Sequence, residues 1–400
     1  MIMMEKCIIM LLSESRLSKH NFLIIGSKDS LRVHAFQKSL QSCIQKKATI
    51  VTYKQVLEQP ESIKPFVNSE TIIRFESPEQ DLSELKALYI AGIDQSSSSG
   101  LKTLIGNEIN AYLEDHGRIV PPAQLSYGLI KAASFVENYA EETHAYCLSS
   151  SSDMLAAMDK TSCLKLLQNN HIHSPYHLGS VTSFDELVEL AKQTGKFRLF
   201  VKLRFGFSAA GMMALAINPS DSQVIAYTTA MMAPNQHLYA TRKLQKLNRV
   251  NHIDQLIEKL APMGLHIESW VPKAGVNDSP VDFRFISIQQ EPIFSILRLS
   301  KSPITNLHLG NSRADPALLK QHMQPKDWLR LEETCTKVAK LFPSSFMLGI
   351  DVAVFNDLRQ HAVLEVNPFG DFIKDVTYQN LSPYDHQIPK WPSNEIKGVE

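Results

Sequence analysis

Two stretches of the sequence, LGIDVAVF (348–355) and LEVNPFGDF (364–372), decide the fold. Each contains a short apolar run with Val or Ile, which is typical of β-strands. The polar residues NDLRQH (356–361) separate the two runs. This pattern predicts a β-hairpin whose turn is centred near Leu358.

The predicted hairpin brings three oxygen-bearing side chains to one surface. A turn near Leu358 places Asp351 opposite Glu365. Because residues two apart on a strand share a face, Asn367 lies on the same side as Glu365. Two carboxylates and an amide form a hard-cation site that leaves room for substrate phosphates, as Mg²⁺ sites usually do. The alternative is an ordinary hairpin whose polar face meets water.

Composition limits the classes of protein to consider. The chain has 400 residues, is 44% apolar and 20% charged, and has a formal net charge of zero. This composition is that of a globular protein with two or three subdomains, and it carries no electrostatic signature of a nucleic-acid or membrane partner. The scattered cysteines have no metal-ligand or redox spacing, which favours reduced thiols and a cytoplasmic location. They are Cys7, Cys43, Cys147, Cys163 and Cys335.

The first third of the chain predicts a parallel α/β layer. Residues 1–20 hold an apolar run that is too short for a membrane span, and we expect a poorly ordered leader there. Strand patterns then alternate with helical ones, which is typical of a parallel sheet. The expected strands begin the segment 21–40 and occupy 48–53 and 70–75. A serine run at 149–152 marks the expected end of this domain.

The middle of the chain suggests phosphate chemistry. Lys160 lies at an expected helix start in AMDKTSCLKLL (157–167), and Lys202 lies on an expected strand. The small-residue loop that follows contains Ser208 and Gly211, and its backbone N–H groups can approach phosphate oxygens closely. Two point charges and many donors suit a triphosphate. The alternative is a hairpin with an exposed lysine, and the loop is not a Walker motif.

A later strand suggests an adenine site. LHIESWVPKAG (265–275) is an apolar strand that ends near Glu268. An edge segment of this kind presents backbone donors and acceptors to an adenine ring, with Trp270 lining the slot. The alternative is that Trp270 is a core aromatic residue.

Two arginines follow on expected strands. VDFRF (281–285) alternates with a period of two, which puts Asp282 and Arg284 on one face. Arg298 lies on the strand that opens ILRLSKSPITNLHLGN (296–311).

The order of these features resembles the ATP-grasp superfamily. That order is a lysine, a lysine with a small-residue loop, Glu-x-Trp-Val, Asp-x-Arg, an arginine strand with TNLHLGN, and then Asp and Glu-x-Asn. The MDK and ESWV stretches resemble D-alanine–D-alanine ligase, and the DFR and TNLHLGN stretches are similar to the ribosomal-protein glutamate ligase branch. The resemblance covers roughly residues 150–372.

The resemblance implies an α/β fold class, with α+β character in the catalytic part. It divides the chain into an N-terminal parallel α/β domain (21–150), a central ATP-grasp subdomain (151–272) and a C-terminal subdomain with the metal site (273–400).

The resemblance also implies a role for each candidate residue. Those that would hold ATP are Lys160, Lys202, Ser208, Gly211, Glu268, Trp270 and Val271. Those that would bind two Mg²⁺ ions, or Mn²⁺ in their place, are Asp351, Glu365 and Asn367. The catalytic residues would be Arg298, beside the transferred γ-phosphoryl group, and Arg284, which would hold a substrate carboxylate.

The implied activity is an ADP-forming carboxylate–amine ligase that acts through an acyl phosphate. Its substrate would be an amino acid, a peptide or a protein side chain, and we expect a homodimer. One alternative is an ATP-grasp kinase of a small alcohol. The basic residues at 242–249 are the feature relevant to a polyphosphorylated acceptor, although a solvated helix face also explains them. Another alternative is a catalytically idle ATP-binding module that recruits a partner.

Among the departures from the family pattern, two concern the nucleotide. The loop SAAG (208–211) is poor in glycine. No acid follows ESWV at the spacing expected for ribose, which leaves Lys273 and Asp278 as the candidates for that contact.

Overall fold

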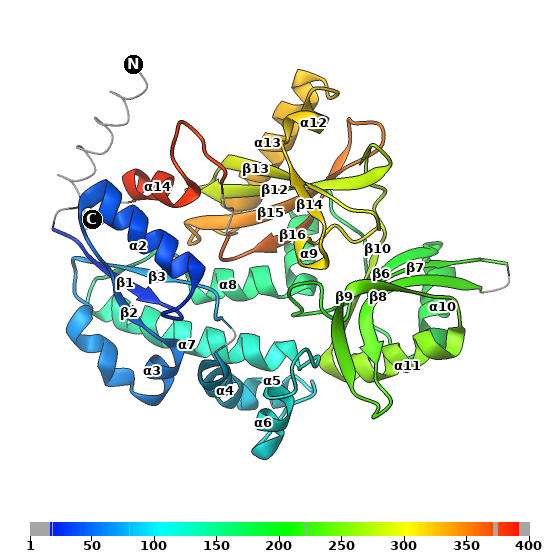
Figure 1. Ribbon diagram of the computed structural model, residues 1–400, viewed down its shortest axis with the longest axis horizontal. Helices are drawn as coiled ribbons and strands as arrows, with labels where there is room; N and C mark the ends of the chain where they lie inside the picture. Colours follow the sequence, from blue (N-terminus) through cyan, green and yellow to red (C-terminus); the bar gives the residue numbers. More distant parts are fainter. Residues whose placement is uncertain (1–16, 18, 80, 221–222, 371–374, 392–400) are drawn as a thin grey trace.

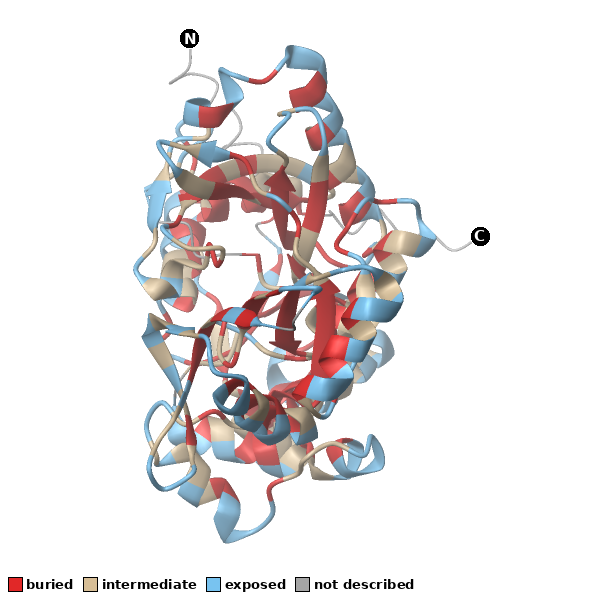
Figure 2. Cartoon of the chain, turned by 90° about the vertical axis from the view of Figure 1, so that its right-hand side faces the viewer, coloured by how far each residue is buried: buried red, intermediate tan, exposed pale blue. Residues whose placement is uncertain are grey.

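The computed structural model describes residues 17, 19–79, 81–220, 223–370 and 375–391. Nearly all of the predicted leader 1–20 therefore lies outside the described residues. The described chain forms three sheets that follow one another in sequence (Figure 1). Buried residues concentrate on the strands of these sheets (Figure 2).

The N-terminal sheet is parallel, as the sequence predicts. Its strand order is β2-β1-β3-β4, and the apolar strands β1 and β3 form its buried centre. The strands are β1 (Asn21–Ile25), β2 (Thr49–Val51), β3 (Thr71–Phe75) and β4 (Tyr146–Cys147). The helices are α2 (Leu31–Ile44), α3 (Tyr53–Glu58), η1 (Pro60–Phe66), α4 (Leu82–Ala91), α5 (Ile93–Ser98), α6 (Asn107–Leu113) and α7 (Pro122–Glu142).

The central sheet is antiparallel, with the order β5-β10-β6-β7-β8-β9. Two amphipathic helices bury their apolar faces against this sheet. Leu187 from one helix and Ile257 from the other belong to the same apolar core as the strands. The strands are β5 (His177–Gly179), β6 (Arg198–Leu203), β7 (Met213–Ile217), β8 (Val224–Met232), β9 (Leu238–Leu247) and β10 (Leu265–Ser269). The helical segments are α10 (Phe184–Thr194), α11 (Val250–Leu260) and η2 (Ala261–Met263).

The C-terminal sheet is also antiparallel, with the order β14-β13-β12-β15-β16 and β11 paired to β12. Its strands are β11 (Gly275–Val276), β12 (Ser279–Ile288), β13 (Glu291–Leu299), β14 (Ser312–Ala314), β15 (Met347–Val354) and β16 (His361–Asn367). The helical segments of this part are η3 (Leu307–Leu309), α12 (Ala317–Lys320), α13 (Pro325–Lys340), α14 (Pro383–Gln387) and η4 (Ile388–Lys390).

The hairpin formed by β15 and β16 has the predicted register at Asp351 and Glu365. Asp351 on β15 lies opposite Glu365 on β16. Leu358 lies in the turn with a φ of 56°, a left-handed conformation that reverses the chain there. The register shifts between Asp351 and Val352, because Val352 pairs with Val363 and leaves Leu364 as an extra residue on β16. This β-bulge is a feature that the alternating pattern did not predict.

The helices that link the first two sheets pack differently from the division predicted from sequence. α8 (Ser151–Met158) and α9 (Lys160–Asn169) contribute Ala157 and Leu164 to the core of the C-terminal sheet. The sequence placed both helices in the central subdomain (151–272), whose sheet core they do not join. The packing therefore groups α9 with the C-terminal part, whereas α8 also contributes Met154 to the core of the N-terminal domain. The domain division itself remains a proposal.

The end of the described chain returns to the N-terminal domain. α14 contacts α2, and Trp391 packs 5.4 Å from Phe36 between ring centroids. The core that contains these residues also includes Ile286 from the C-terminal sheet. The N-terminal layer and the C-terminal sheet are thereby joined through one continuous apolar core.

Candidate active site

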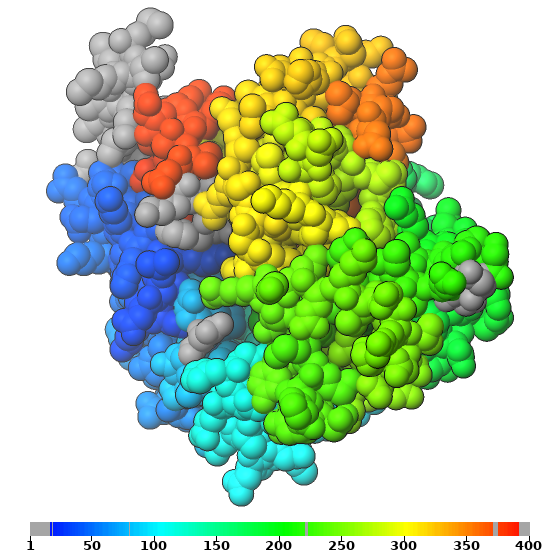
Figure 3. Space-filling model, turned by 45° about the vertical axis from the view of Figure 1, so that its right-hand side comes forward, coloured from blue at the N-terminus to red at the C-terminus, as the bar shows by residue number. Residues whose placement is uncertain are grey.

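A cavity of about 70 Å³ lies between the central and C-terminal sheets, and it gathers residues that are far apart in sequence. In the space-filling view the green central part lies directly against the yellow C-terminal part (Figure 3). Six of the sequence-predicted site residues line the cavity: Lys202, Glu268, Val271, Arg298, Asp351 and Glu365. Tertiary packing therefore brings half of the twelve predicted site residues to one cavity.

The other predicted residues lie outside the lining. Trp270 is not among the lining residues; its ring centroid lies 5.4 Å from that of Phe200, which does line the cavity, and 5.1 Å from the guanidinium of Arg198. Its role in binding adenine stays a prediction. The remaining members of this group are Lys160, Ser208, Gly211, Arg284 and Asn367. Lys160 and Arg284 still contact lining residues directly, through Glu365 and Asp351.

Asp351 is held by two arginines from neighbouring strands. Arg284 on β12 pairs with it through Nε and through Nη2, the second at 2.9 Å from Oδ2. Nη2 of Arg298 on β13 lies 3.0 Å from the same Oδ2. Burial opposes ionisation, but the two guanidinium groups outweigh it and lower the pKa of Asp351. Asp351 is therefore an ionised carboxylate with both oxygens occupied.

Glu365 and Lys160 form a second ion pair in the site. Lys160 Nζ lies 2.9 Å from Glu365 Oε1 and also donates to the carbonyl oxygen of Gly206 at 2.5 Å. Asp159 accepts from the backbone N–H of Thr161 at the start of α9, which fixes where Lys160 leaves the helix. Lys160 thus connects β16, the strand that carries the predicted metal ligand Glu365, with the small-residue loop.

Lys202 and Glu268 form the third ion pair. They lie on the adjacent antiparallel strands β6 and β10, and Lys202 Nζ contacts Glu268 Oε1. Burial would raise the pKa of Glu268, but Lys202 and His266 outweigh this effect and hold it at about 2. The opposite signs suit a nucleotide, because the lysine matches a phosphate and the carboxylate matches an amino group.

A fourth cluster joins Asp282, Arg298 and Lys273, which the sequence analysis named separately without predicting that they meet. Asp282 accepts from Arg298 Nε at 2.7 Å and pairs with Lys273 Nζ at 2.9 Å. Lys273 also donates to Thr305 Oγ1 at 2.7 Å. Lys273 lines the cavity, whereas Asp278 lies exposed in the β11–β12 turn, so of the two ribose candidates only Lys273 borders the site.

The sequence analysis also did not assign the apolar residues that line the cavity between the two sheets to the site. They are Pro175, Phe200, Met212, Pro303, Ile304 and Leu364. Leu364 reaches the cavity together with its neighbour Glu365, although strand neighbours ordinarily face opposite sides. The bulge at Leu364 accounts for this, because an extra residue re-aims the side chains beside it.

The predicted metal ligands fit a divalent cation only in part. Among the described residues no group of three or more His, Cys, Asp or Glu side chains could hold a metal ion. Asn367, at the end of β16, has a buried side-chain amide nitrogen without a hydrogen-bond partner among the described residues. Carboxylate and amide oxygens suit Mg²⁺, but Asp351 and Glu365 are already neutralised by arginine and lysine side chains. A metal would need additional ligands, such as phosphate oxygens.

The small-residue loop has an unusual backbone for its sequence. Ser208 and Ala209 have φ values of 53° and 58°, and Gly211 has 68°. A left-handed conformation costs a non-glycine residue about 1–2 kcal/mol, so two residues of this loop are strained. Thr229 Oγ1 donates to the carbonyl oxygen of Ala209 at 2.5 Å, which helps to hold the turn. The loop keeps the backbone form of a glycine-rich loop despite its sequence.

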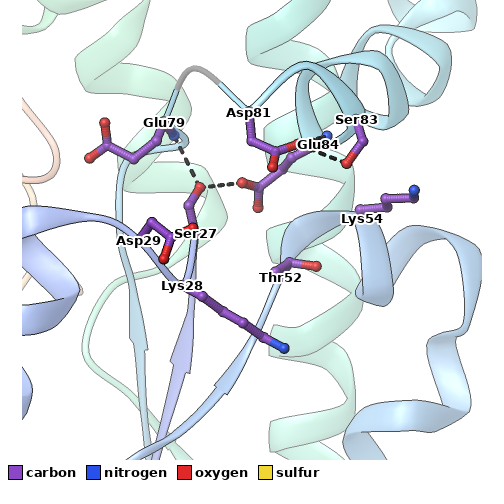
Figure 4. Close-up of a pocket in the computed structure, with 9 residues that line it drawn as sticks. All are labelled: Ser27, Lys28, Asp29, Thr52, Lys54, Glu79, Asp81, Ser83 and Glu84. Carbon is purple, nitrogen blue, oxygen red and sulfur yellow. Dashed lines mark hydrogen bonds between the residues drawn. The ribbon is translucent and has the colours of Figure 1, made fainter.

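A second cavity, of about 420 Å³, lies at the carboxyl ends of the N-terminal strands (Figure 4). Glu84 from α4 accepts from the backbone N–H of Tyr53 at 3.0 Å and from Ser27 Oγ. Desolvation raises the pKa of Glu84. The lining residues are Ser27, Lys28, Asp29, Thr52, Lys54, Glu79, Asp81, Ser83 and Glu84. This end of an open parallel sheet is where α/β folds usually bind ligands.

Comparisons with known proteins identify the architecture. No family model and no curated protein matches the sequence. Among solved structures, the ligase PsnB in complex with a minimal precursor, Mg and ADP has a TM-score of 0.51 at 13% identity, over 92% of this chain and 96% of that one. The chain has the ATP-grasp fold.

Two other solved structures share the ATP-grasp fold with this chain. The macrocyclase MdnC from Microcystis aeruginosa MRC, bound with the precursor peptide MdnA, has a TM-score of 0.51 at 12% identity, over 92% of this chain and 97% of that one. Biotin carboxylase from Campylobacter jejuni, in a complex with β,γ-ATP, has a TM-score of 0.51 at 14% identity, over 92% of this chain and 70% of that one. The predicted fold class is confirmed. In the described part of the chain, no helix is both long and apolar enough to span a membrane.

Proposed function

We propose that this chain is an ATP-dependent carboxylate–amine ligase that acts through an acyl phosphate. The observation that carries the proposal is the cavity between the two sheets, where Lys202, Glu268, Arg298, Asp351 and Glu365 converge. It holds charges of both signs and no candidate protein nucleophile of the Cys–His type among its lining residues. Phosphoryl transfer needs such positioning and charge neutralisation rather than a nucleophile.

The proposed reaction has two steps. A substrate carboxylate oxygen attacks the γ-phosphorus of ATP, the bond to the bridging oxygen breaks, and ADP leaves. The nitrogen of an amine then attacks the acyl carbon, the amine loses a proton, and phosphate leaves. Mg²⁺ would neutralise phosphate charge in the first step. A positive donor for the tetrahedral oxyanion is needed in the second, and Arg298 is our candidate.

We assign the binding roles from the position of each group. Lys202 would leave Glu268 for the phosphates, which frees a carboxylate oxygen for the adenine amino group. Lys160 would act similarly, exchanging Glu365 for a phosphate oxygen and releasing that carboxylate to Mg²⁺. Each positive side chain is now paired with an acid, so nucleotide binding replaces one set of ion pairs by another.

The cavity must enlarge before a nucleotide can enter. Its volume is about 70 Å³, whereas sites for small molecules and cofactors span roughly 300–1,000 Å³. We infer that the central subdomain swings away from the C-terminal sheet, carrying the loop around Ser208 and Gly211. Domain closure of this kind would shield the acyl phosphate from water.

A peptide is our preferred substrate class. PsnB and MdnC were solved with a precursor and a precursor peptide, and both match this chain along nearly its whole length. The second cavity, with four carboxylates and two lysines in its lining, would suit an acceptor that carries both an amine and a carboxylate. A homodimer, a second Mg²⁺ ion, Mn²⁺ as a substitute and a cytoplasmic location stay predictions.

The kinase alternative receives less support. The basic residues at 242–249 do not form a helix face: Arg242, Lys243 and Lys246 lie on the edge strand β9, and Arg249 precedes α11. The helical interpretation of this cluster was wrong. None of these residues lines either cavity, so they do not build a pocket for a polyphosphorylated alcohol.

Trapping the intermediate tests the proposal. The protein would be incubated with ATP, Mg²⁺, hydroxylamine and a panel of amino acids and short peptides, while ADP release and hydroxamate are measured. A hydroxamate that requires one substrate would establish an acyl phosphate and name the carboxylate. ADP formation with a phosphorylated alcohol as product would favour the kinase, and no nucleotide binding at all would contradict both enzymes.

A further inference from the structure

His266 occupies the centre of a hydrogen-bonded chain that the proposed reaction does not use. It lies on β10, two residues before Glu268, and its side chain is fully buried. Its Nε2 lies 3.1 Å from Glu268 Oε2, and its Nδ1 lies 3.0 Å from Thr161 Oγ1 on α9. The imidazole therefore joins a residue next to Lys160 with the carboxylate that we assign to adenine.

The chemistry of the partners fixes the tautomer of His266. Desolvation lowers the pKa of His266, which keeps the ring neutral. The ionised carboxylate of Glu268 only accepts hydrogen bonds, so Nε2 must carry the proton. Nδ1 is then an acceptor, and the hydroxyl of Thr161 donates to it. This chain of donors has one consistent direction, from Thr161 through His266 to Glu268.

The surroundings of His266 leave the ring little freedom. The ring of His177 on β5 stacks on it with a centroid distance of 4.6 Å and an interplanar angle of 16°. Both ring nitrogens have partners, and the side chain has no exposed surface. A hydrogen bond that His266 donates therefore points in a fixed direction, which also fixes the plane of the Glu268 carboxylate.

We propose that His266, oriented by Thr161, is a positioning residue that makes Glu268 selective for the 6-amino group of adenine. The inference rests on the proposed function, because it assumes that Glu268 faces the base. His266 occupies Oε2 permanently, so only Oε1 is available once Lys202 turns to the phosphates. An ionised oxygen in a fixed place accepts from an amino group and disfavours a purine without a donor at that position.

The test compares two nucleotides rather than one. Dissociation constants would be measured by calorimetry for ATP and for purine riboside 5′-triphosphate, which lacks the 6-amino group. The wild-type protein should prefer ATP, since a hydrogen bond to a charged group contributes roughly 1.5–3 kcal/mol, or about 10–150-fold in affinity. Thr161→Val removes the donor to Nδ1 with little change of volume, and the preference should fall by about threefold or more. Thr161→Ser keeps the hydroxyl and should keep the preference.

A second variant guards against a failure to fold. His266→Gln retains an N–H that can reach Glu268, whereas His266→Leu does not. The glutamine variant should therefore keep more of the preference for ATP over purine riboside 5′-triphosphate than the leucine variant. Equal losses for both nucleotides in Thr161→Val would overturn the inference, since a merely structural role weakens both alike. A wild-type protein that binds both nucleotides equally would also overturn it. Neither result depends on turnover. If the wild-type protein yields a hydroxamate but Thr161→Val leaves the ratio of the two dissociation constants unchanged, only this inference is refuted.

Discussion

Asp351 and Glu365 face each other across the β15–β16 pair, yet they are bonded to cations from different parts of the chain. Asp351 is held by Arg284 and Arg298, whose strands belong to the same sheet. Glu365 pairs with Lys160, the first residue of α9, and Lys160 Nζ lies 2.9 Å from Glu365 Oε1. The carboxylates of the proposed metal site are thus neutralised separately, and each could be released separately.

Removing the charge of Glu365 should stop ATP turnover. We expect Glu365→Gln to lower the turnover number roughly 100-fold or more, because an amide supplies no charge to Mg²⁺, whose stabilisation is worth several kcal/mol. Glu333→Gln, on the exposed face of α13, is the matched control. Turnover within about twofold of wild type would contradict the site. Asp351 is a poorer probe, because its loss removes a carboxylate that pairs with both Arg284 and Arg298, and breaking a buried ion pair costs about 3–5 kcal/mol in folding stability.

Metal binding should depend on nucleotide because of Lys160. Without nucleotide, Lys160 competes with a cation for Glu365, so Mn²⁺ used as a probe should bind weakly. Lys160→Met should strengthen Mn²⁺ binding in the absence of nucleotide by roughly tenfold, if it removes a pair worth about 1.4 kcal/mol. The same variant should weaken ATP binding. Electron paramagnetic resonance measures free Mn²⁺, and weaker metal binding in Lys160→Met would refute the competition.

Lys202 and Arg298 should affect different kinetic constants. Lys202→Met should weaken ATP binding, because the lysine meets phosphates in the ground state. Arg298→Lys keeps the charge but loses the guanidinium fork, and it should mainly lower the turnover number. Lys243→Met and Arg242→Lys on the exposed strand β9 are the controls. If Arg298→Lys changed only the Michaelis constant, its role would be substrate binding.

The small-residue loop should become ordered when nucleotide binds. Residues 204–212 contain strained left-handed positions and are held by Lys160 through Gly206. Amide hydrogen exchange across 204–212 should slow when an ATP analogue and Mg²⁺ are added together, because the loop then closes over the phosphates. Unchanged exchange at saturating nucleotide would mean that this loop is not the lid. The loop between β12 and β13 serves as an internal reference.

The stacked histidines predict a pH window of reduced stability. Desolvation lowers the pKa of His177 to about 4, and it also lowers the pKa of His266. Above pH 6.5 both rings are neutral in either state; as the pH falls from about 6.5 the unfolded chain binds protons first, so stability decreases until about pH 4. Lys165 and Glu268 also act on His177, with opposite signs. Glu268, whose pKa is about 2 in the folded chain, adds a further loss of stability that begins below its ordinary pKa of about 4.5 and is complete only near pH 2.

The measurement is the urea midpoint between pH 8 and pH 4, in steps of about half a unit. His177→Gln should reduce the decrease, and His252→Gln on the exposed face of α11 should leave it unchanged. An undiminished pH dependence in His177→Gln would assign the effect to other groups.

The sequence by itself determined the elements whose pattern is local. The alternation of apolar and polar residues around Leu358 predicted the β15–β16 hairpin and the register of Asp351 with Glu365. The apolar strands near the start predicted the parallel N-terminal layer. These features follow from periodicity and turn chemistry within a few residues, which the chain carries regardless of its partners.

Only the tertiary structure decided which groups meet. The bulge at Leu364 depends on how β16 pairs with β15, and no local pattern predicts the extra residue. The packing of Trp270 against Phe200 and the link from Thr161 to His266 join segments that are distant in sequence. Such contacts depend on how sheets and helices dock, because burial and ion pairing act between surfaces that periodicity alone does not match.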